Sequence, residues 1–174
     1  MRITTIITLI TALFAVAAEM KESDTMDSKC CPTPAKELHI IWERLLVENE
    51  TCPRCSTTEA ELDKAVGLLQ SSLEPLGISV TVEKKEITLA EFKADPTRSN
   101  RIVINGRTLE EWLGAQSGQS PCCDVCGDEE CRTVEVAGNT YEAIPAELIV
   151  RAGLVAAAAI PLTVPDAPCC GGSK

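Results

Sequence analysis

The chain has 174 residues, of which 45% are apolar, so it can bury the core of one domain and does not have the composition of a disordered protein. Aromatic residues are only 3% of the total, and aliphatic side chains must therefore fill that core. The formal net charge of -10 argues against a polyanionic partner, and we expect no binding of nucleic acid.

The first 17 residues differ in composition from the rest of the chain. An apolar stretch there ends in Ala15-Val16-Ala17, small residues of the kind that precede a signal-peptide cleavage site. Residues 1–17 are therefore predicted to be a signal peptide or membrane anchor, which places the protein on the periplasmic side of the membrane. If translation starts downstream, at Met20 or Met26, a cytoplasmic protein is expected instead.

The remainder divides into three regions. Residues 18–36 form a polar linker that carries Cys30-Cys31. Residues 37–160 show the periodic patterns of a folded domain. Residues 161–174 are rich in proline and contain Cys169-Cys170, as expected of a flexible tail.

Within residues 37–160 the hydrophobic periodicity alternates between strand and helix. Ser56 and Glu59 form a capping box, which predicts that a long helix starts at Ser56. Residues 114–131 are rich in glycine, serine and cysteine and are predicted to be a loop. The other predicted elements are, in chain order, a strand at 38–47, the long helix up to 75–77, a strand at 78–83, a short helix at 88–94, a strand at 102–104 before the turn Asn105-Gly106, a helical turn at 109–113, a hairpin of 133–136 with 141–144, and a helix at 145–159.

This order of elements predicts the fold class. Strand–helix–strand units join parallel strands, whereas a hairpin adds antiparallel ones. We therefore expect an α/β protein with a thioredoxin-like core, in which helices flank a small mixed sheet and a cysteine-rich loop is inserted.

A CxxC sequence, Cys52-Pro53-Arg54-Cys55, lies between the first predicted strand and the long helix. The amide groups at a helix start, together with Arg54, stabilise a thiolate and lower the pKa of a thiol. Cys52 and Cys55 are thus predicted to be the attacking and resolving thiols of a thiol–disulfide oxidoreductase, with half of a zinc site or a plain disulfide as the alternatives. Thioredoxin-like enzymes usually carry a proline where Asn100 stands, and this departure favours metal binding at the two cysteines.

Four cysteines of the predicted loop lie close together in the sequence. Thiolates in such a cluster can surround one tetrahedral ion, for which Zn²⁺ is the default, whereas the spacing fits no standard iron–sulfur motif. Cys52 and Cys55 are available as further ligands from a distant segment. The metal ligands predicted in the loop are Cys122, Cys123, Cys126 and Cys131.

Three pairs of cysteines are adjacent in the sequence. Neighbouring Cα atoms are about 3.8 Å apart, closer than an unstrained disulfide requires, so each pair is better suited to holding one soft ion than to bridging itself. Such ions include arsenite, mercuric, copper and zinc ions. Incidental reactive thiols, bridges between distant pairs and intermolecular disulfides are the alternatives. The tail pairs that are predicted to be additional ligands are Cys30-Cys31 and Cys169-Cys170.

A recognisable pattern is carried by five segments of the chain, Ile41–Leu45, Thr51–Cys55, Ser99–Leu113, Gln119–Glu142 and Ile144–Gly153. Together they resemble an uncharacterised prokaryotic family that is described only as a domain of unknown function (DUF2703). The resemblance covers about residues 37–158 and is most specific at Ser120–Gly127. It implies a thioredoxin-like fold and no settled activity. Separately, the adjacent cysteines are similar in ligand type to those of arsenic metallochaperones.

Two functions follow from these patterns. The favoured one is thiolate-based binding or relay of a soft metal or metalloid ion, with a thiol protein or a transporter as the partner in the exchange. The other is a thiol–disulfide oxidoreductase that uses Cys52 and Cys55. An interaction domain stabilised by disulfides or zinc, without turnover, is the third.

Overall fold

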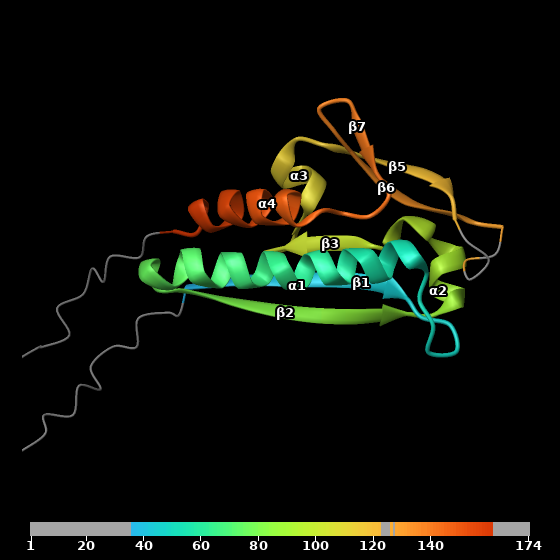
Figure 1. Ribbon diagram of the computed structural model, residues 1–174, viewed down its shortest axis with the longest axis horizontal. Helices are drawn as coiled ribbons and strands as arrows, with labels where there is room; N and C mark the ends of the chain where they lie inside the picture. Colours follow the sequence, from blue (N-terminus) through green and yellow to red (C-terminus); the bar gives the residue numbers. More distant parts are fainter. Residues whose placement is uncertain (1–35, 123–125, 127, 162–174) are drawn as a thin grey trace, which may run out of the picture. The chain divides into compact units, whose positions relative to one another are not determined.

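The computed structural model of the protein describes residues 36–122, 126 and 128–161 (Figure 1). The predicted signal peptide, the linker with Cys30-Cys31 and the tail with Cys169-Cys170 lie outside the described residues. The elements are, in chain order, β1 (Lys36–Leu45), α1 (Pro53–Leu73), a 3₁₀ turn (Glu74–Leu76), β2 (Ile78–Ile87), α2 (Leu89–Ala94), a second 3₁₀ turn (Pro96–Arg98), β3 (Arg101–Ile104), β4 (Arg107–Thr108), α3 (Leu109–Leu113), β5 (Gln116–Pro121), β6 (Glu130–Val136), β7 (Asn139–Tyr141) and α4 (Ala146–Ala158).

The described strands form two sheets. The first is mixed and has the order β2-β1-β3-β4, in which β1 is parallel to β2 and antiparallel to β3. Ile40 in β1 lies opposite Val82 on one side and Ile104 on the other. The second sheet is antiparallel with the order β5-β6-β7. Its last two strands form the predicted hairpin, but the second of them is Asn139–Tyr141 and not 141–144. The predicted α/β class, with helices beside a small mixed sheet, is confirmed.

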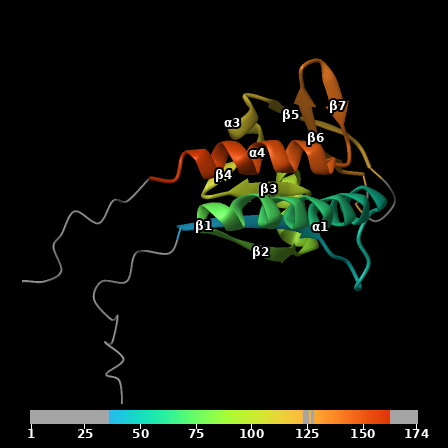
Figure 2. The ribbon, with the colours of Figure 1, turned by 60° about the vertical axis from the view of Figure 1, so that its left-hand side comes forward.

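Helices α1 and α4 lie side by side over one face of the mixed sheet (Figures 1 and 2). Leu38, Ile40 and Trp42 alternate along β1 and are fully buried, as the two-residue period of a strand requires for the face that helices cover. The two helices approach closely, since a Cβ atom at Gly153 of α4 would lie 2.7 Å from Cδ1 of Leu69 in α1. The buried side chains of this core are mostly aliphatic.

The helix α1 begins one turn earlier than the capping box predicted. Cys52 is the N-cap residue and Pro53 occupies the first helical turn, where the missing N–H of proline costs no helical hydrogen bond. The Ser56 hydroxyl donates to the Pro53 carbonyl at 3.0 Å, and the Glu59 carboxylate accepts a hydrogen bond from Arg44 of β1 at 2.7 Å. Neither side chain caps the helix. The CxxC sequence is therefore the helix start itself and does not precede it.

The loop predicted at 114–131 contains β5 and the first two residues of β6, so this prediction was wrong for Gln116–Pro121 and for Glu130 and Cys131. The strand β5 has mostly exposed, polar side chains, and its sequence therefore lacks the apolar alternation by which a strand is recognised. It is held by pairing with β6, in which Ser120 lies opposite Cys131. Gly118 permits this pairing because a Cβ atom there would lie 2.8 Å from Oγ1 of Thr133.

Candidate metal centre

The first turn of α1 holds two sulfur atoms next to each other. Cys52 is the N-cap, and the Cys55 N–H donates a hydrogen bond to Cys52 Sγ at 3.4 Å. Both side chains are buried, with 2% and 1% of their surface exposed. The start of the helix therefore directs a backbone N–H at Cys52 Sγ, an arrangement that stabilises negative charge on sulfur.

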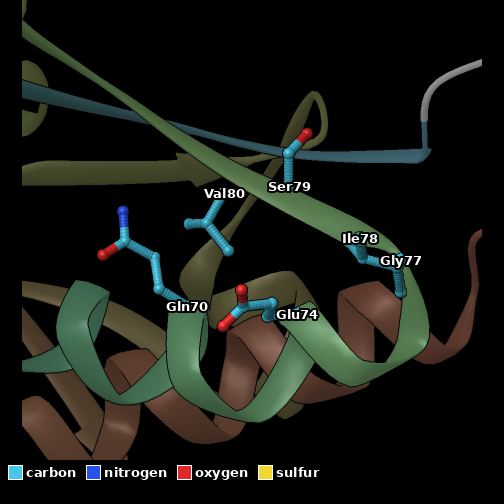
Figure 3. A pocket seen from close by; sticks show the side chains of 6 residues that line it. All are labelled: Gln70, Glu74, Gly77, Ile78, Ser79 and Val80. Atoms are coloured by element: carbon cyan, nitrogen blue, oxygen red, sulfur yellow. The ribbon is translucent and has the colours of Figure 1, made fainter.

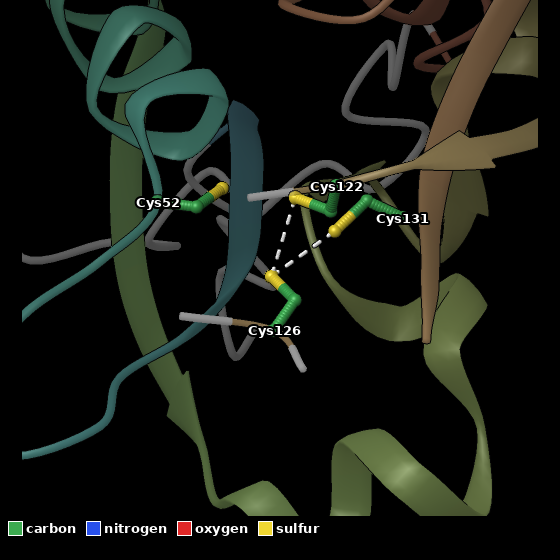
Figure 4. A group of neighbouring side chains, drawn as sticks. All are labelled: Cys52, Cys122, Cys126 and Cys131. Carbon is green, nitrogen blue, oxygen red and sulfur yellow. Dashed lines mark hydrogen bonds between the residues drawn. The ribbon is translucent and has the colours of Figure 1, made fainter. Parts of the chain in front are cut away.

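Three cysteines from the β5–β6 region lie beside Cys52. Cys122 directly follows β5, and Cys131 lies in β6. Cys126 Sγ is 3.3 Å from Cys122 Sγ and 3.2 Å from Cys131 Sγ. The sulfur atoms of all four residues lie within 4.8 Å of one another and face a common space (Figure 4). We call Cys52, Cys122, Cys126 and Cys131 the four-thiol site.

The dimensions of the four-thiol site suit a tetrahedral ion. Zinc–sulfur bonds of about 2.3 Å place the sulfur atoms of a tetrathiolate about 3.8 Å apart. The separations in the site, from 3.2 Å to an upper limit of 4.8 Å, include that value. Three of the cysteines are buried and Cys122 is half-buried. Four cysteines thus lie close enough together to hold a metal ion in a largely enclosed site, and the donor set is purely sulfur.

Hydrogen bonds among the thiols decide which sulfur loses its proton first. Hydrogen bonds from Cys126 and Cys131 hold the pKa of Cys52 well below its usual range, against the opposing effect of burial. The hydrogen bond with Cys52, together with burial, raises the pKa of the Cys55 thiol. Hydrogen bonds with Cys126 and Cys52 also raise the pKa of Cys131. In the ion-free site a thiolate is therefore expected at Cys52, and thiols that are still protonated lose their protons when an ion binds.

Arg54 joins the start of α1 to the end of β5. Its Nη1 donates to Ser120 Oγ at 2.9 Å, and its Nη2 donates to the Pro121 carbonyl at 2.6 Å. Nη2 also lies 2.7 Å from a carboxylate oxygen of Glu142. The sequence predicts that Arg54 adds to the stabilisation of a thiolate at the helix start. Its hydrogen bonds tie the start of α1 to the segment that leads into Cys122.

The turn before β3 contacts the second cysteine of the CxxC sequence. Ser99 Oγ lies 3.7 Å from Cys55 Sγ. Asn100, where a thioredoxin-like enzyme is expected to carry proline, has a φ of 61°, a left-handed conformation that asparagine adopts more readily than most residues. Its side chain accepts from Trp42 Nε1 at 3.1 Å and donates to the Glu142 carbonyl at 3.3 Å. Hydrogen bonds of the asparagine side chain thus hold this turn against the site.

A buried ion pair fixes the position of β6. Arg132, which follows Cys131, lies 2.7 Å from Glu110 of α3 and donates to the Thr97 carbonyl at 3.0 Å. Both charged side chains are buried. Separating them would leave an unpaired charge in the interior, so the pair favours one placement of the strand that carries Cys131.

Only some of the predicted site residues lie together in the structure. It brings Cys52 together with three loop cysteines and leaves Cys55 beside Cys52, outside the four-thiol site. The contacts of Arg54 and Ser99 were missed, because they join segments 44 or more positions apart and have no local sequence signal. The predicted ligands that lie outside the described residues are Cys30, Cys31, Cys123, Cys169 and Cys170.

Two pockets lie away from the cysteines. One, of about 440 Å³, is bounded by the end of α1 and the start of β2, and its polar lining residues are Gln70, Glu74 and Ser79 (Figure 3). The other, of about 320 Å³, is mostly apolar and is bordered by Lys36, Leu73 and Ile160. Neither pocket brings together side chains of a recognisable catalytic or metal-binding site. Among the residues that the structure describes, no helix has the length and apolar character needed to span a membrane.

Comparison with known proteins places the chain in a family. It matches the family described as "Domain of unknown function (DUF2703)" over residues 38–153, a range that contains the whole four-thiol site. The chain belongs to this family. An uncharacterized protein of Archaeoglobus fulgidus is 51% identical over 113 residues, which are 65% of this chain and 82% of the relative. No solved structure matches the chain.

Proposed function

We propose that the protein binds a soft metal or metalloid ion through the thiolates of the four-thiol site. The observation that carries the proposal is the convergence of four sulfur atoms, within 4.8 Å of one another, from the start of α1 and from the β5–β6 region. Sulfur ligands favour ions of the arsenite, mercuric, copper and zinc classes over magnesium or calcium. A largely buried site also protects the bound ion from water.

We further propose that the scaffold is thioredoxin-like. The order β2-β1-β3-β4, the parallel pairing of β1 with β2 and the placement of α1 and α4 on one face support this assignment. The CxxC sequence at the junction of β1 and α1 supports it as well. On this scaffold the predicted proline position is occupied by Asn100, and Cys52 takes part in a cluster of thiols.

The exchange of the ion with a thiol protein or a transporter is part of the proposal. The tail pairs Cys30-Cys31 and Cys169-Cys170 are proposed to act as exchanging ligands in metalloid resistance or metal handling. Export through the signal peptide at residues 1–17 would place this exchange on the periplasmic side. Mass spectrometry of the protein from its native source, with thiols labelled, tests both points, since it reports N-terminal cleavage, reduced thiols and bound ion together.

The ion-binding proposal is tested by titrating the fully reduced, full-length protein with each of the four ions against a small dithiol competitor. We expect at least one ion to bind more tightly to the protein than to the dithiol. Cys126→Ser should weaken that binding more than the roughly 10–100-fold that the loss of an outer-shell partner costs, because it removes a ligand. Cys55→Ser, which retains all four ligands, is the matched control. Equal affinity of wild-type protein and dithiol for every ion contradicts the proposal.

The second candidate function is thiol–disulfide exchange by Cys52 and Cys55. It is favoured by the hydrogen bond from the Cys55 N–H to Cys52 Sγ at the helix start. The same two variants separate the candidates. An oxidoreductase loses disulfide reduction in Cys55→Ser and retains it in Cys126→Ser, whereas an ion-binding protein shows the opposite pattern in ion affinity.

A further inference from the structure

Cys52 belongs to two groups of sulfur atoms at once, the four-thiol site and the CxxC pair. We infer that Cys55 is the redox partner of Cys52, and that oxidation of this pair by a small hydroperoxide withdraws Cys52 from the four-thiol site and releases the bound ion. The inference rests on the proposed function, since it concerns the release of the ion that the site holds.

The position of Cys55 carries the first part of the argument. It is the one described cysteine that is not a member of the four-thiol site. The first turn of α1 holds it next to Cys52, and its own N–H donates to Cys52 Sγ at 3.4 Å. Cysteines in this CxxC arrangement at a helix start can form a disulfide with little movement of the backbone.

A bound ion determines which thiol near Cys52 can form a disulfide with it. When an ion is bound, the other three neighbours of Cys52 are ligands, and their sulfur atoms are engaged by the ion. Cys55 is then the adjacent thiol that remains available to attack an oxidised Cys52. Its sulfur contacts Ser99 Oγ at 3.7 Å, which holds it at the edge of the site.

The redox step balances with one hydroperoxide per pair. The thiolate of Cys52 attacks one oxygen of hydrogen peroxide, so that an S–O bond forms, the O–O bond breaks and hydroxide leaves, which takes a proton from solvent to become water. The sulfur of Cys55 then attacks Cys52, so that the S–S bond forms and the S–O bond breaks, with loss of a second water. The sum is one thiolate, one thiol, one hydrogen peroxide and one proton from solvent to one disulfide and two waters; the sulfurs are oxidised and the peroxide is reduced.

Burial restricts the oxidant, and the loss of one ligand explains the release. The side chains of Cys52 and Cys55 are only 2% and 1% exposed, which favours a small peroxide over a bulky disulfide such as oxidised glutathione. A sulfur in a disulfide is no longer a thiolate and cannot serve as a ligand. Three thiols, Cys122, Cys126 and Cys131, remain, so an ion that requires four is held much less tightly. Reduction by a dithiol restores the site.

The experiment uses full-length protein loaded with Zn²⁺, with excess ion removed, and follows zinc release by a chromogenic chelator after addition of hydrogen peroxide. The wild-type protein is expected to release its zinc as a Cys52–Cys55 disulfide forms, identified by mass spectrometry of non-reduced peptides. Cys55→Ala should bind zinc as the wild type does and release it about tenfold more slowly, because an oxidised Cys52 lacks its resolving thiol. Oxidised glutathione should act more slowly than peroxide on the wild-type protein.

Two controls make the result decisive. Cys55→Ser repeats the loss of the thiol with a polar replacement, in case Cys55→Ala does not fold. Ser71→Ala, at an exposed position near the other end of α1, keeps both thiols and should release zinc as the wild type does. Equal release from wild type and both Cys55 variants, or a disulfide that excludes Cys55, overturns the inference while leaving the proposed function intact. Failure of the reduced wild-type protein to bind any of the four soft ions overturns the proposed function, and the inference with it.

Discussion

The helix–sheet core and the thiol end of the domain are held together by different forces. In the core, α1 and α4 bury aliphatic side chains against the mixed sheet, and such burial is not directional. At the thiol end, Arg54, Asn100 and Arg132 connect segments through hydrogen bonds and ion pairs, which do fix direction. The comparison indicates that folding stability and ion binding depend on separate residues and can be changed separately by mutation.

The largest expected effect on stability comes from Leu69→Ala. Leu69 is fully buried between α1 and α4 and faces Gly153, so its truncation leaves a cavity and should lower the free energy of unfolding by about 2–5 kcal/mol. The affinity of the reduced protein for its ion should stay unchanged. Urea unfolding and ion titration measure the two effects.

Leu68→Ala is the matched control, because Leu68 is 56% exposed and its truncation should cost no more than about 0.5 kcal/mol. Loss of ion binding in a folded Leu69→Ala protein would show that the two regions are not separable.

Arg54→Met should have the opposite profile. It keeps the aliphatic stem and removes the guanidinium that binds Ser120, Pro121 and Glu142, so ion affinity should fall about 10–100-fold as the ligands become less well positioned. Stability of the ion-free protein should change little. Arg44→Met is the control, since Arg44 is as buried as Arg54 but pairs with Glu59 and Glu86, away from the cysteines. Equal loss of affinity in both variants would contradict a positioning role for Arg54.

The smallest expected effect concerns Glu43, a buried carboxylate that accepts hydrogen bonds from Arg98 at 3.0 Å and Arg101 at 2.8 Å. Burial raises the pKa of Glu43, but the hydrogen bonds from Arg98 and Arg101 outweigh it and hold the pKa below its usual value. The unfolded chain therefore binds this proton at higher pH than the folded chain does. Glu43 stabilises the fold above about pH 4.3, and this contribution is lost as the pH falls through the lower folded pKa.

Glu43→Gln should therefore cost on the order of 1 kcal/mol at pH 7 and weaken the dependence of stability on pH below 5. Urea unfolding at a series of pH values checks both expectations. Zinc affinity at pH 7 should be unchanged, because Glu43 forms its hydrogen bonds and ion pairs with Arg98, Arg101 and Lys85. If the free energy of unfolding of Glu43→Gln falls with decreasing pH as steeply as that of the wild type, Glu43 does not contribute to the pH dependence.

The elements that depend on apolar periodicity were predictable from the sequence. The strand around Ile40, the buried strand at Ile102–Ile104 and the helix that contains Gly153 lie close to their predicted positions, since burial imposes a period of 2 or 3.6 residues. β5 was not predictable in this way. Its stability comes from pairing with β6 and from the hydrogen bonds of Arg54, and neither leaves a periodic pattern in its own residues.

The sequence predicted that the candidate site consists of cysteines, but not which cysteines lie together. Residue type and clustering singled out the cysteines, because sulfur ligands are chemically distinctive. That Cys52 lies among the loop cysteines while Cys55 contacts Ser99 depends on which side of the first turn of α1 faces β6. This choice follows from the packing of segments that are far apart in the chain, and no local pattern records it.

The helix α1 gives the domain two poles. Cys52 caps one end of its 21 residues and Leu73 is at the other, which at 1.5 Å per residue is about 32 Å away. Lys36 and Ile160, at the two limits of the described fold, border the same pocket as Leu73. A bead or fused domain joined directly to either of these residues is therefore attached at the end of α1 opposite the four-thiol site. Immobilised protein can then meet chelators, oxidants and partner proteins at the opposite pole.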